Sequence, residues 1–399
     1  MSNLVSAKLK DLVDNFDNQR VPLSVKQRST LEKKFRYYGA QGVIDYVDDY
    51  IFDGEYILVA EDGENLKSQR NNICNYVTGK FWVNNHAHII RAKENNNTKY
   101  LYYALNLVNF RNYVTGSAQP KLTKDNLGEI VLHVHRCDEQ QKIARVISTL
   151  DAKIELNNRI NAELEAMAKT LYDYWFVQFD FPDANGKPYK TSGGKMVYNP
   201  TLKREIPEGW EATTVGKISK TELGGTPSTA VDEYWQNADI PWLSSAETAS
   251  FPIITSEQKI TPAGIDNSAA TLLPKGTVVI SIVRYIRPSI LGIDAATNQS
   301  VVGIRECKRL KSSFIYPYFC SEVPRLMGLR TGAQQPHINK GVIEDSPIVI
   351  PCEKVLTAYY KAADPIFEKI MNLALQSHEL MQLRDWLLPM LMNGQVTVR

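Results

Sequence analysis

The histidines and cysteines of this 399-residue chain are not grouped as metal ligands or nucleophiles. His86 and His88 alternate along an expected strand, as do His133 and His135, which indicates ordinary surface or half-buried residues. The five cysteines are scattered without a CxxC pair, so neither structural zinc nor a disulfide framework is expected. These residue types therefore predict no metal site.

The segments that approach a catalytic motif are incomplete. The phosphate-binding pattern GxxxxGK[ST] is absent, so an ATP-driven motor activity is not expected. Asn199-Pro200-Thr201-Leu202 lacks the second proline and the aromatic residue of a nucleotide methyltransferase loop. Glu64 and Lys67 are one residue too far apart for the acid-x-Lys pair of a metal-dependent nuclease. The chain is therefore predicted to carry no catalytic residues.

The phrase TGSAQPKLTK at residues 115–124 returns as TGAQQPHINK at residues 331–340, 216 positions later. Seven of thirteen aligned positions match in type without a gap, which indicates an internal duplication. Glycine and proline favour a closing turn, whereas the glutamines and lysines could contact phosphates or bases. Both interpretations of this repeated phrase remain open.

A long helix is expected after each copy of the phrase. Its apolar positions recur at three- and four-residue spacing, the pattern of a coiled coil, and this pattern reappears 216 residues later. We hypothesise an antiparallel pair in which Asn157 lies near Ser377 in a polar layer, and parallel helices would contradict this. Asp364-Pro365 is either a helix start or a kink. The residues expected to pair the helices are Ile147, Leu150, Ile154, Asn157, Leu164, Leu171, Ile366, Ile370, Leu373, Ser377, Leu380 and Leu387.

The predicted fold is α+β, with two β-rich units joined by two long antiparallel coiled-coil helices as a pseudo-two-fold tandem repeat. Short β-branched and aromatic runs between turn residues predict the strands of both units. A connector rich in proline, glycine and lysine, with little hydrophobic periodicity, separates the halves. The predicted boundaries are 1–136 for the first unit, 137–178 for its helix, 179–205 for the connector, 206–351 for the second unit and 352–393 for its helix.

The composition is that of a globular protein, with 43% hydrophobic and 23% charged residues. The chain has no apolar run long enough to span a bilayer and its beginning shows no secretory signal pattern, so a cytoplasmic location is expected. The net charge of +2 neither indicates nor excludes a nucleic-acid partner. Between Lys26 and Arg36, five basic residues accompany one acid. This cluster is either a solvated loop or a patch that faces phosphates.

The segment CDEQQKIARVISTLDAKIELNNRI follows the form EQxxIxxxLxxxDxxI, with Glu139, Gln140, Ile143, Asp151 and Ile154 in or near those positions. Together with the tandem arrangement, it resembles the spacer helix of the specificity subunits of type I DNA restriction-modification enzymes. The resemblance covers essentially the whole chain. YYGAQGVIDYVDDYIFDGEYILVAEDG and GGTPS…YWQNADIPWLS resemble first and second target-recognition domains, and TGxxQPx[LI]xK resembles the loop that closes them. The second helix begins with PCEKVLTAYY and lacks the Glu-Gln pair, which puts its start in doubt.

The resemblance implies a subunit without catalytic machinery that recognises a bipartite target in double-stranded DNA, one half-site for each recognition domain. Its helices would set the gap between the half-sites. The implied partners are two modification (methyltransferase) subunits and restriction (motor-nuclease) subunits, with no membrane partner. S-adenosylmethionine, ATP and Mg²⁺ would belong to those partners, and none to this chain. The alternatives are a self-sufficient restriction or modification enzyme with degenerate motifs and an orphan coiled-coil adaptor.

Residues that could contact DNA are basic, amide, hydroxyl and aromatic side chains near expected loops and strand ends, and each could instead be an exposed residue without a partner. The aromatic residues Tyr172, Tyr174, Trp175 and Phe176 could pack the connector or form a partner surface. The predicted DNA contacts are Lys26, Arg28, Lys33, Lys34, Arg36, Tyr37, Tyr38, Gln41, Lys67, Gln69, Arg70, Gln119, Lys121, Ser244, Ser245, Arg284, Tyr285, Arg287, Gln299, Gln335, His337 and Lys340.

Overall fold

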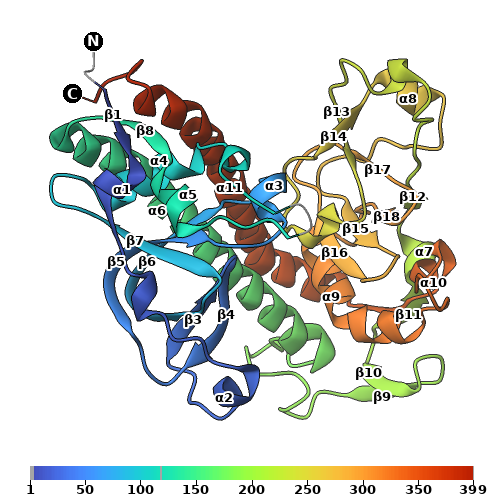
Figure 1. The fold of residues 1–399 in the computed structure, drawn as a ribbon. Coiled ribbons are helices and arrows are strands. Elements are labelled where there is room, and N and C mark those ends of the chain that lie inside the picture. The colour runs from blue at the N-terminus through green and yellow to red at the C-terminus, as the bar shows by residue number, and fades with distance from the viewer. Residues whose placement is uncertain (1–3, 117–118, 399) are drawn as a thin grey trace. The chain divides into compact units, whose positions relative to one another are not determined.

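The computed structural model describes residues 4–116 and 119–398 (Figure 1). The chain divides into two compact units. Unit 1 contains the chain up to Ile154 and again from Leu380, and unit 2 contains Glu155–Glu379. Two long helices, α6 (Cys137–Tyr172) and α11 (Glu353–Met392), contribute residues to both units.

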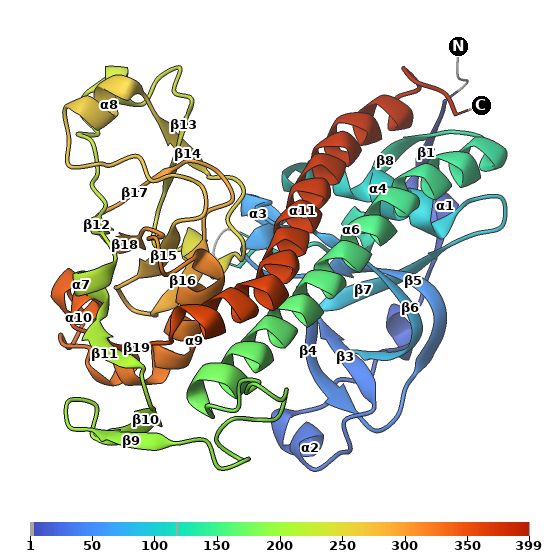
Figure 2. The same ribbon diagram turned by 180° about the vertical axis from the view of Figure 1, so that it is seen from behind.

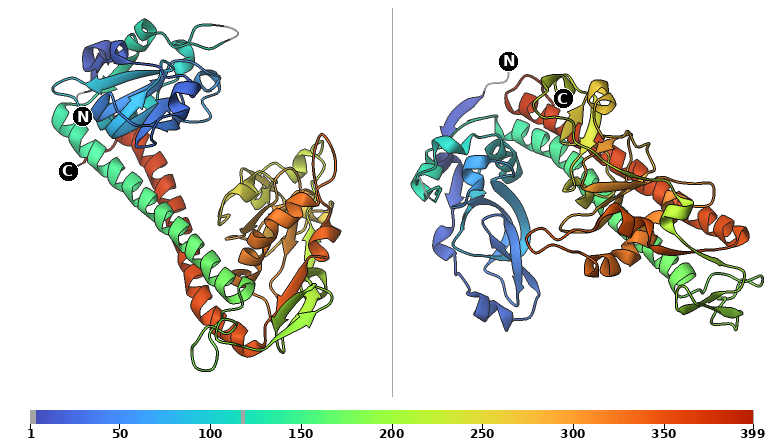
Figure 3. Two further views of the ribbon diagram at one scale, coloured as in Figure 1. Left: turned by 90° about the horizontal axis from the view of Figure 1, so that it is seen from below. Right: turned by 90° about the vertical axis from the view of Figure 1, so that its right-hand side faces the viewer.

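Unit 1 is built on a six-stranded sheet (Figure 3). In its strand β5 (Phe52–Ala60), the residues from Tyr56 onward are buried on both faces. Along β5, Tyr56 and Leu58 join one apolar cluster, whereas Ile57 and Val59 join another that includes Tyr100 of α4. This alternation follows from the two-residue period of a strand. The strands, in sheet order, are β2 (Val13–Asn15), β7 (Ala87–Ala92), β5 (Phe52–Ala60), β6 (Cys74–Val83), β3 (Phe35–Gly39) and β4 (Gly42–Val47).

Short helices and a separate strand pair complete unit 1. The longest of these helices, α4, begins after Asn97, whose side chain accepts a hydrogen bond from the Tyr100 amide at 2.9 Å. The antiparallel pair is β1 (Val5–Lys8) with β8 (Val131–Val134). The helices are α1 (Leu9–Leu12), α2 (Val25–Ser29), α3 (Asn65–Ser68), α4 (Thr98–Asn106) and α5 (Lys124–Gly128).

Unit 2 contains a four-stranded sheet, a three-stranded sheet and two strand pairs. The four-stranded sheet has the order β12 (Thr221–Leu223), β18 (Val301–Ile304), β15 (Val278–Ser281) and β16 (Arg287–Ile290). The three-stranded sheet has the order β14 (Gln258–Ile260), β13 (Ile240–Leu243) and β17 (Ala296–Thr297). The pairs are β9 (Met196–Asn199) with β10 (Arg204–Pro207), and β11 (Glu211–Thr214) with β19 (Pro347–Ile350). Its other helices are the short α7 (Val215–Ile218), α8 (Pro262–Asp266) and α10 (Lys340–Glu344) and the 17-residue α9 (Ser312–Gly328).

The internal duplication predicted from the repeated phrase is confirmed by the order of elements in the two units. The strand pairs β1–β8 and β11–β19 correspond, as do the pairs β2–β7 and β12–β18. Helices α5 and α10, strands β8 and β19, and the starts of α6 and α11 are each separated by the same 216 residues as the phrase.

The two long helices are antiparallel, as expected, and their segments lie side by side in each unit (Figure 2). In unit 2, Asn157 donates from Nδ2 to Oε1 of Gln376 at 2.8 Å, and Asn161 donates to the carbonyl of Ile370 at 3.2 Å. In unit 1, Arg384 pairs with Asp151 at 3.1 Å. Residue numbers therefore rise along α6 as they fall along α11.

The residues expected to pair the helices are all buried or half-buried. Asn157 and Ser377 are both buried, but the hydrogen-bond partner of Asn157 is Gln376, the neighbour of Ser377. Oδ1 of Asn157 and Oγ of Ser377 have no hydrogen-bond partner. The fully buried members are Ile147, Ile154, Asn157, Ile370, Leu373 and Ser377, and the half-buried members are Leu150, Leu164, Leu171, Ile366, Leu380 and Leu387.

The structure of unit 2 answers two questions that the sequence left open. Asp364-Pro365 lies inside α11 and is not a helix start; the Asp364 carboxylate instead accepts hydrogen bonds from Lys311 and Ser313 at 2.6 and 2.7 Å. Tyr172, Trp175 and Phe176 are buried in the core of unit 2, whereas Tyr174 remains exposed.

The connector is more ordered than its composition indicates. It contains the β9–β10 hairpin, and the ring of Phe181 stacks between those of Tyr189 and Trp210. Aromatic packing thus replaces the hydrophobic periodicity that the sequence lacks.

We expect Gly116→Ala to destabilise unit 1 more than Gly332→Ala destabilises unit 2. Both glycines have positive φ, at 86° and 97°, but a Cβ at Gly116 would overlap the Gln119 carbonyl, whereas one at Gly332 would lie 3.1 Å from the Gln335 carbonyl. The cost at Gly116 is about 1–3 kcal/mol. Hydrogen–deuterium exchange of α5 and of α10 measures each unit separately. Gly328→Ala, where a Cβ meets nothing, is the control, and equal effects at all three positions would contradict the argument.

We expect Asn157→Asp to lower the free energy of unfolding by about 2–4 kcal/mol, because it places a carboxylate at a fully buried position whose Oδ1 has no hydrogen-bond partner. Asn158→Asp is the matched control, since Asn158 is exposed on the next position of α6 and its substitution should change stability by less than about 0.5 kcal/mol. Urea unfolding of both variants measures the difference. If the two variants were equally stable, the layer around Asn157 would not be a buried one.

Candidate nucleic-acid interface

The first copy of the repeated phrase closes onto the end of the central strand of unit 1. The amides and carbonyls of Thr115 and Lys121 are bonded to each other, both at 2.8 Å. The next residue, Leu122, is fully buried, and its amide donates to the carbonyl of Glu61 at 2.8 Å, directly after β5. The Gly63 amide donates to the Pro120 carbonyl at 3.3 Å. The phrase therefore holds the segment that leaves β5.

The second copy makes the same contacts in unit 2. Thr331 and His337 exchange backbone hydrogen bonds of 2.9 Å, and the buried Ile338 donates to the carbonyl of Ile282, directly after β15, at 3.0 Å. The Arg284 amide donates to the Pro336 carbonyl at 2.7 Å. The closing-turn interpretation of the phrase is thus confirmed for its backbone. The side chains of Gln119 and Gln335 are exposed, so contact with DNA stays a prediction for them.

Behind the first loop lies a buried charged network. His88, which is 1% exposed, places Nδ1 2.6 Å from the Asp17 carboxylate and Nε2 2.8 Å from the Leu122 carbonyl. Arg20 pairs with Glu61 at 2.6 Å, and Lys121 reaches the same carboxylate at 3.3 Å. The expectation of a surface or half-buried His88 is therefore wrong, since it anchors the repeated loop to β7.

Neighbouring positive charges keep the two carboxylates of this network ionised. Burial opposes ionisation of Asp17, but the hydrogen bond and charge of His88 outweigh it and lower the pKa of Asp17. Burial likewise opposes ionisation of Glu61, and the hydrogen bond from Arg20 with the charges of His88 and Arg20 lowers its pKa. Both carboxylates are thus held as anions that bind the loop in place.

Three of the five basic residues between Lys26 and Arg36 are paired with nearby acids. Arg28 and Lys33 both pair with Asp45, at 2.6 and 2.9 Å, and Lys34 pairs with Glu32. Lys26 and Arg36 remain exposed. These pairs favour the solvated-loop interpretation of the cluster over a patch that faces phosphates.

Tyr37 and Tyr38 are predicted to contact DNA, but both are buried core residues. Tyr37 is 1% exposed and its hydroxyl accepts from the Leu23 amide at 2.9 Å, while Tyr38 packs edge-to-face on Phe81. Consecutive strand residues normally face opposite sides. A register shift between these two tyrosines, typical of a β-bulge, accompanies the burial of both.

The remaining candidates of unit 1 lie around α3 and the loop that follows it. Gln41, Gln69 and Arg70 line one polar cavity of about 610 Å³. The Gln69 side chain donates to Oδ1 of Asn109 at 3.0 Å, and Lys67 lies on α3 itself. Gln41, in the β3–β4 turn, and Arg70 are distant in sequence but line the same cavity.

The candidates of unit 2 gather where several strands end. β13 and β17 are parallel and end at Leu243 and Thr297, and the amide of Asn298 donates to the Leu243 carbonyl at 2.9 Å. The Ile282 amide, after β15, donates to the Ser300 carbonyl at 3.0 Å. This edge therefore carries Ser244, Ser245, Gln299, Arg284, Tyr285 and Arg287, and the repeated loop adds Gln335 and His337.

Within this edge, Arg284, Tyr285 and Arg287 of one turn are exposed. Tyr285 is 60% exposed, and the Arg287 guanidinium lies over its ring at 4.9 Å. Arg284 adopts a positive φ of 60°, and Arg330 donates to its carbonyl. The other candidates are more constrained, because Ser244 donates to Glu247, Gln299 accepts from Thr226 and Lys340 pairs with Glu344.

The family model of the type I restriction modification DNA specificity domain matches residues 1–166 and 207–355. The chain belongs to this family. It is 29% identical over 311 residues to the MjaIX specificity subunit of Methanocaldococcus jannaschii, covering 75% of this chain and 69% of that protein. It is 23% identical to the HindI specificity subunit of Haemophilus influenzae, over 69% of this chain and 71% of that protein.

The same fold occurs in a solved structure, the S subunit of a type I restriction-modification system from M. genitalium. The TM-score is 0.64 at 14% identity, over 98% of this chain and 96% of that one. The α+β tandem fold with two long antiparallel helices is therefore confirmed for this member of the specificity family.

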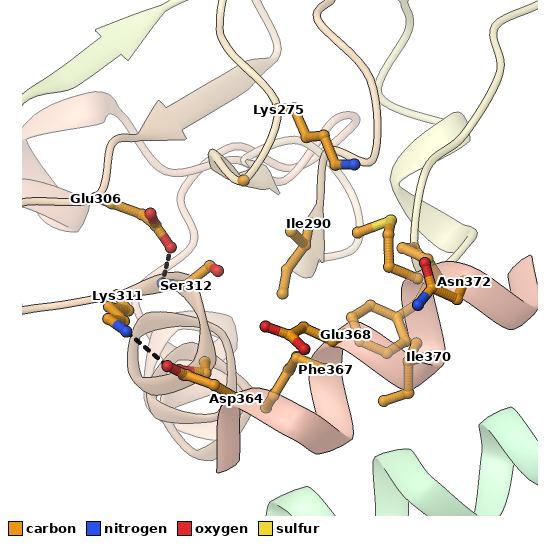
Figure 4. Close-up of a pocket in the computed structure, with 15 residues that line it drawn as sticks. Lys275, Ile290, Glu306, Lys311, Ser312, Asp364, Phe367, Glu368, Ile370 and Asn372 are labelled. Atoms are coloured by element: carbon orange, nitrogen blue, oxygen red, sulfur yellow. Dashed lines mark hydrogen bonds and ion pairs between the residues drawn. The ribbon is translucent and has the colours of Figure 1, made fainter. Parts of the chain in front are cut away.

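A second cavity, of about 500 Å³, lies between the sheet of unit 2 and α11 (Figure 4). Glu306, Asp364 and Glu368 outnumber the two lysines that line it, Lys275 and Lys311. Lys311 is already paired with Asp364 at 2.6 Å, and the Ser312 amide donates to Glu306 at 2.6 Å. Its net negative charge disfavours phosphates, so this cavity is not the interface.

In the described part of the chain, residues 4–116 and 119–398, no group of His, Cys, Asp or Glu is arranged to hold a metal ion. Nor does any helix within those ranges combine the length and apolar character needed to cross a bilayer.

Two features of the interface escaped the sequence prediction. The first is the Asp17–His88 pair, whose members are 71 residues apart and meet only through the β2–β7 side of the sheet. The second is Asn71, which follows Arg70 and lines the same cavity. The run of polar residues from Gln69 to Asn72 between two apolar segments is the signal that could have located it.

We expect Asp17→Asn to destabilise unit 1 by about 1–3 kcal/mol at neutral pH, the value of a hydrogen bond to a charged group. Because the pKa of Asp17 is lowered in the folded state, its contribution is complete above its ordinary value of 3.8 and is lost as pH falls through the lowered folded value. The difference between variant and wild type should therefore shrink below about pH 4.

Calorimetric unfolding between pH 3 and pH 7 measures this dependence. Asp14→Asn is the control, because Asp14 is an exposed acid on β2 and should show no such difference. A gap between Asp17→Asn and wild type that stays constant through pH 3 would show that the charge of Asp17 contributes nothing.

Proposed function

We propose that this chain is the DNA specificity subunit of a type I restriction-modification complex and carries no catalytic residues of its own. Each recognition domain, predicted at 1–136 and 206–351, reads one half of a bipartite target in double-stranded DNA. Two matches of the family model, one in each half of the chain, support two recognition domains.

The observation that supports this proposal is that the two units share a backbone arrangement but carry different exposed side chains on it. In both units the repeated loop fixes the segment that leaves the central strand. The exposed side chains near that segment are Arg284, Tyr285 and Arg287 in unit 2, but mainly amides with Arg70 in unit 1. Arginine and amide side chains form the bidentate contacts that distinguish bases. One scaffold thus presents two different recognition surfaces, as two unrelated half-sites require.

The two long helices set the gap between half-sites in this proposal. A helix of 36 residues such as α6 is about 54 Å long, against about 34 Å for one duplex turn. The polar layer around Asn157 supports a fixed register between α6 and α11. A fixed register makes the gap a constant of the protein.

The partners in this proposal are two modification subunits and the restriction subunits. S-adenosylmethionine, ATP and Mg²⁺ act in those subunits, and this chain contributes specificity and assembly. Extrusion of the target base belongs to the modification subunit, since methylation requires the base outside the duplex.

The test is to express the chain with type I modification subunits and to map methylated bases across the host genome. We expect a split motif with a constant gap. Methylation or cleavage by the purified chain alone would support a self-sufficient enzyme instead. An unsplit motif, or none in an assembled complex, would overturn the proposal and favour an orphan adaptor.

The double variant Arg284→Ala/Arg287→Ala should relax one half-site and leave the other unchanged, because a base contact by arginine contributes about 1–3 kcal/mol of discrimination. Lys308→Ala is the control for charge, since Lys308 is exposed in unit 2 but lies away from the edge that carries Tyr285. Equal changes in both half-sites would contradict the assignment of unit 2 to one of them.

A further inference from the structure

The polar cavity of unit 1 differs from the other cavities in the chemistry of its walls. Ten residues line it, and none of them is an acid. Arg70 provides its only charge. Its amide side chains are Gln41, Gln69, Asn71, Asn72, Asn75 and Asn106. We call this cavity the amide hollow.

The floor of the amide hollow is held rigid by some of these amides. The Asn106 side chain binds both backbone groups of Cys74. It accepts a hydrogen bond from the Cys74 amide at 3.1 Å and donates one to the Cys74 carbonyl at 3.3 Å. Asn65 brackets Asn71 in the same way, at 3.1 and 3.0 Å. These bonds fix the middle of the short loop between α3 and β6 and the first residue of β6.

Two further amides complete the support of this loop. Gln69 has a positive φ of 50°, and its side chain donates to Asn109 at 3.0 Å. The Asn72 side chain lies close to the Tyr102 hydroxyl. The loop is therefore preorganised, so a ligand would not have to order its backbone.

Three other side chains of the hollow do not support the loop. Gln41, Arg70 and Asn71 are exposed, and within the described residues their side chains form no hydrogen bond or ion pair. Arg70 contrasts with Arg28, which is committed to Asp45 at 2.6 Å. The hollow thus combines an unpaired guanidinium and two free amides on a fixed backbone.

This combination matches the edges of bases. An amide forms two hydrogen bonds with N6 and N7 of adenine, and a guanidinium forms two with O6 and N7 of guanine, both in the major groove. A surface for phosphates alone would need more positive charge than one arginine. The lack of acids leaves nothing to repel the duplex.

We propose that Gln41, Arg70 and Asn71 form the base-reading surface of the first recognition domain and contact purine edges in the major groove of its half-site. This inference rests on the proposed function for the presence of duplex DNA. It assigns the specificity of unit 1 to the amide hollow and not to the basic cluster between Lys26 and Arg36.

The test uses the full chain assembled with modification subunits, and the readout is the set of methylated motifs together with binding to synthetic duplexes. Gln41→Ala, Asn71→Ala and Arg70→Ala should each reduce discrimination about 5- to 150-fold at one or two positions of a single half-site. The other half-site and the gap should not change. Arg70→Lys should lose discrimination as Arg70→Ala does, because lysine keeps the charge but not the bidentate geometry.

The controls are Asn18→Ala, an exposed amide outside the hollow, and Lys33→Ala, a member of the paired basic cluster. Both should leave the motif unchanged. Since all substituted side chains of the hollow are exposed, unchanged thermal unfolding checks that each variant is folded.

The outcomes separate this inference from the function on which it rests. An unchanged motif in all three alanine variants, with a split motif in the wild type, overturns the inference and leaves the proposed function standing. Uniform weakening on every duplex, with a smaller salt dependence, indicates phosphate contacts and also overturns base reading. No split motif with the wild-type complex overturns the proposed function itself.

Discussion

The hydrogen bond from Leu122 to Glu61, and its counterpart from Ile338 to Ile282, is the contact on which the position of the repeated loop depends in both units. Each joins the buried apolar residue at the end of the repeated loop to the first carbonyl after the central strand. Burial of the apolar side chain stabilises the end of the loop. The backbone hydrogen bond then holds the segment that leaves the central strand in a fixed position. A loop that reads bases must be rigid before binding, because ordering it afterwards would reduce affinity.

The two units support this contact differently. In unit 1, Asp17 and His88 attach the Leu122 carbonyl to β7, while Glu61 is held by Arg20. In unit 2, Arg330 donates to the carbonyl of Arg284, on the segment that the second loop holds. The duplication therefore preserves the backbone arrangement, whereas the side chains that support it have diverged. Divergence behind the loop is tolerated because the same position can be fixed by different partners.

The sequence predicted those features that depend on periodicity or on the duplication: two units, two antiparallel helices and the equivalence of α5 with α10. It did not predict contacts between separate elements or the burial of individual strand residues. Asp45 on β4 pairs with Arg28 of the short helix α2, and Tyr37 and Tyr38 are both buried beside a register shift in β3. The candidate site was thus partly predicted, since residue type identifies a possible contact but burial and pairing decide its availability.

The residues that hold the loops are buried, whereas candidate DNA contacts such as Arg70 and Tyr285 are exposed. Leu122 and Ile338 are buried and their backbone bonds hold the loops, so substitution there affects the whole unit. Arg70 and Tyr285 are exposed on segments that other residues hold in place, so their substitution leaves the core intact. Specificity can therefore change at exposed positions without loss of stability. Because each unit has its own scaffold, one half of a bipartite target can change while the other is retained.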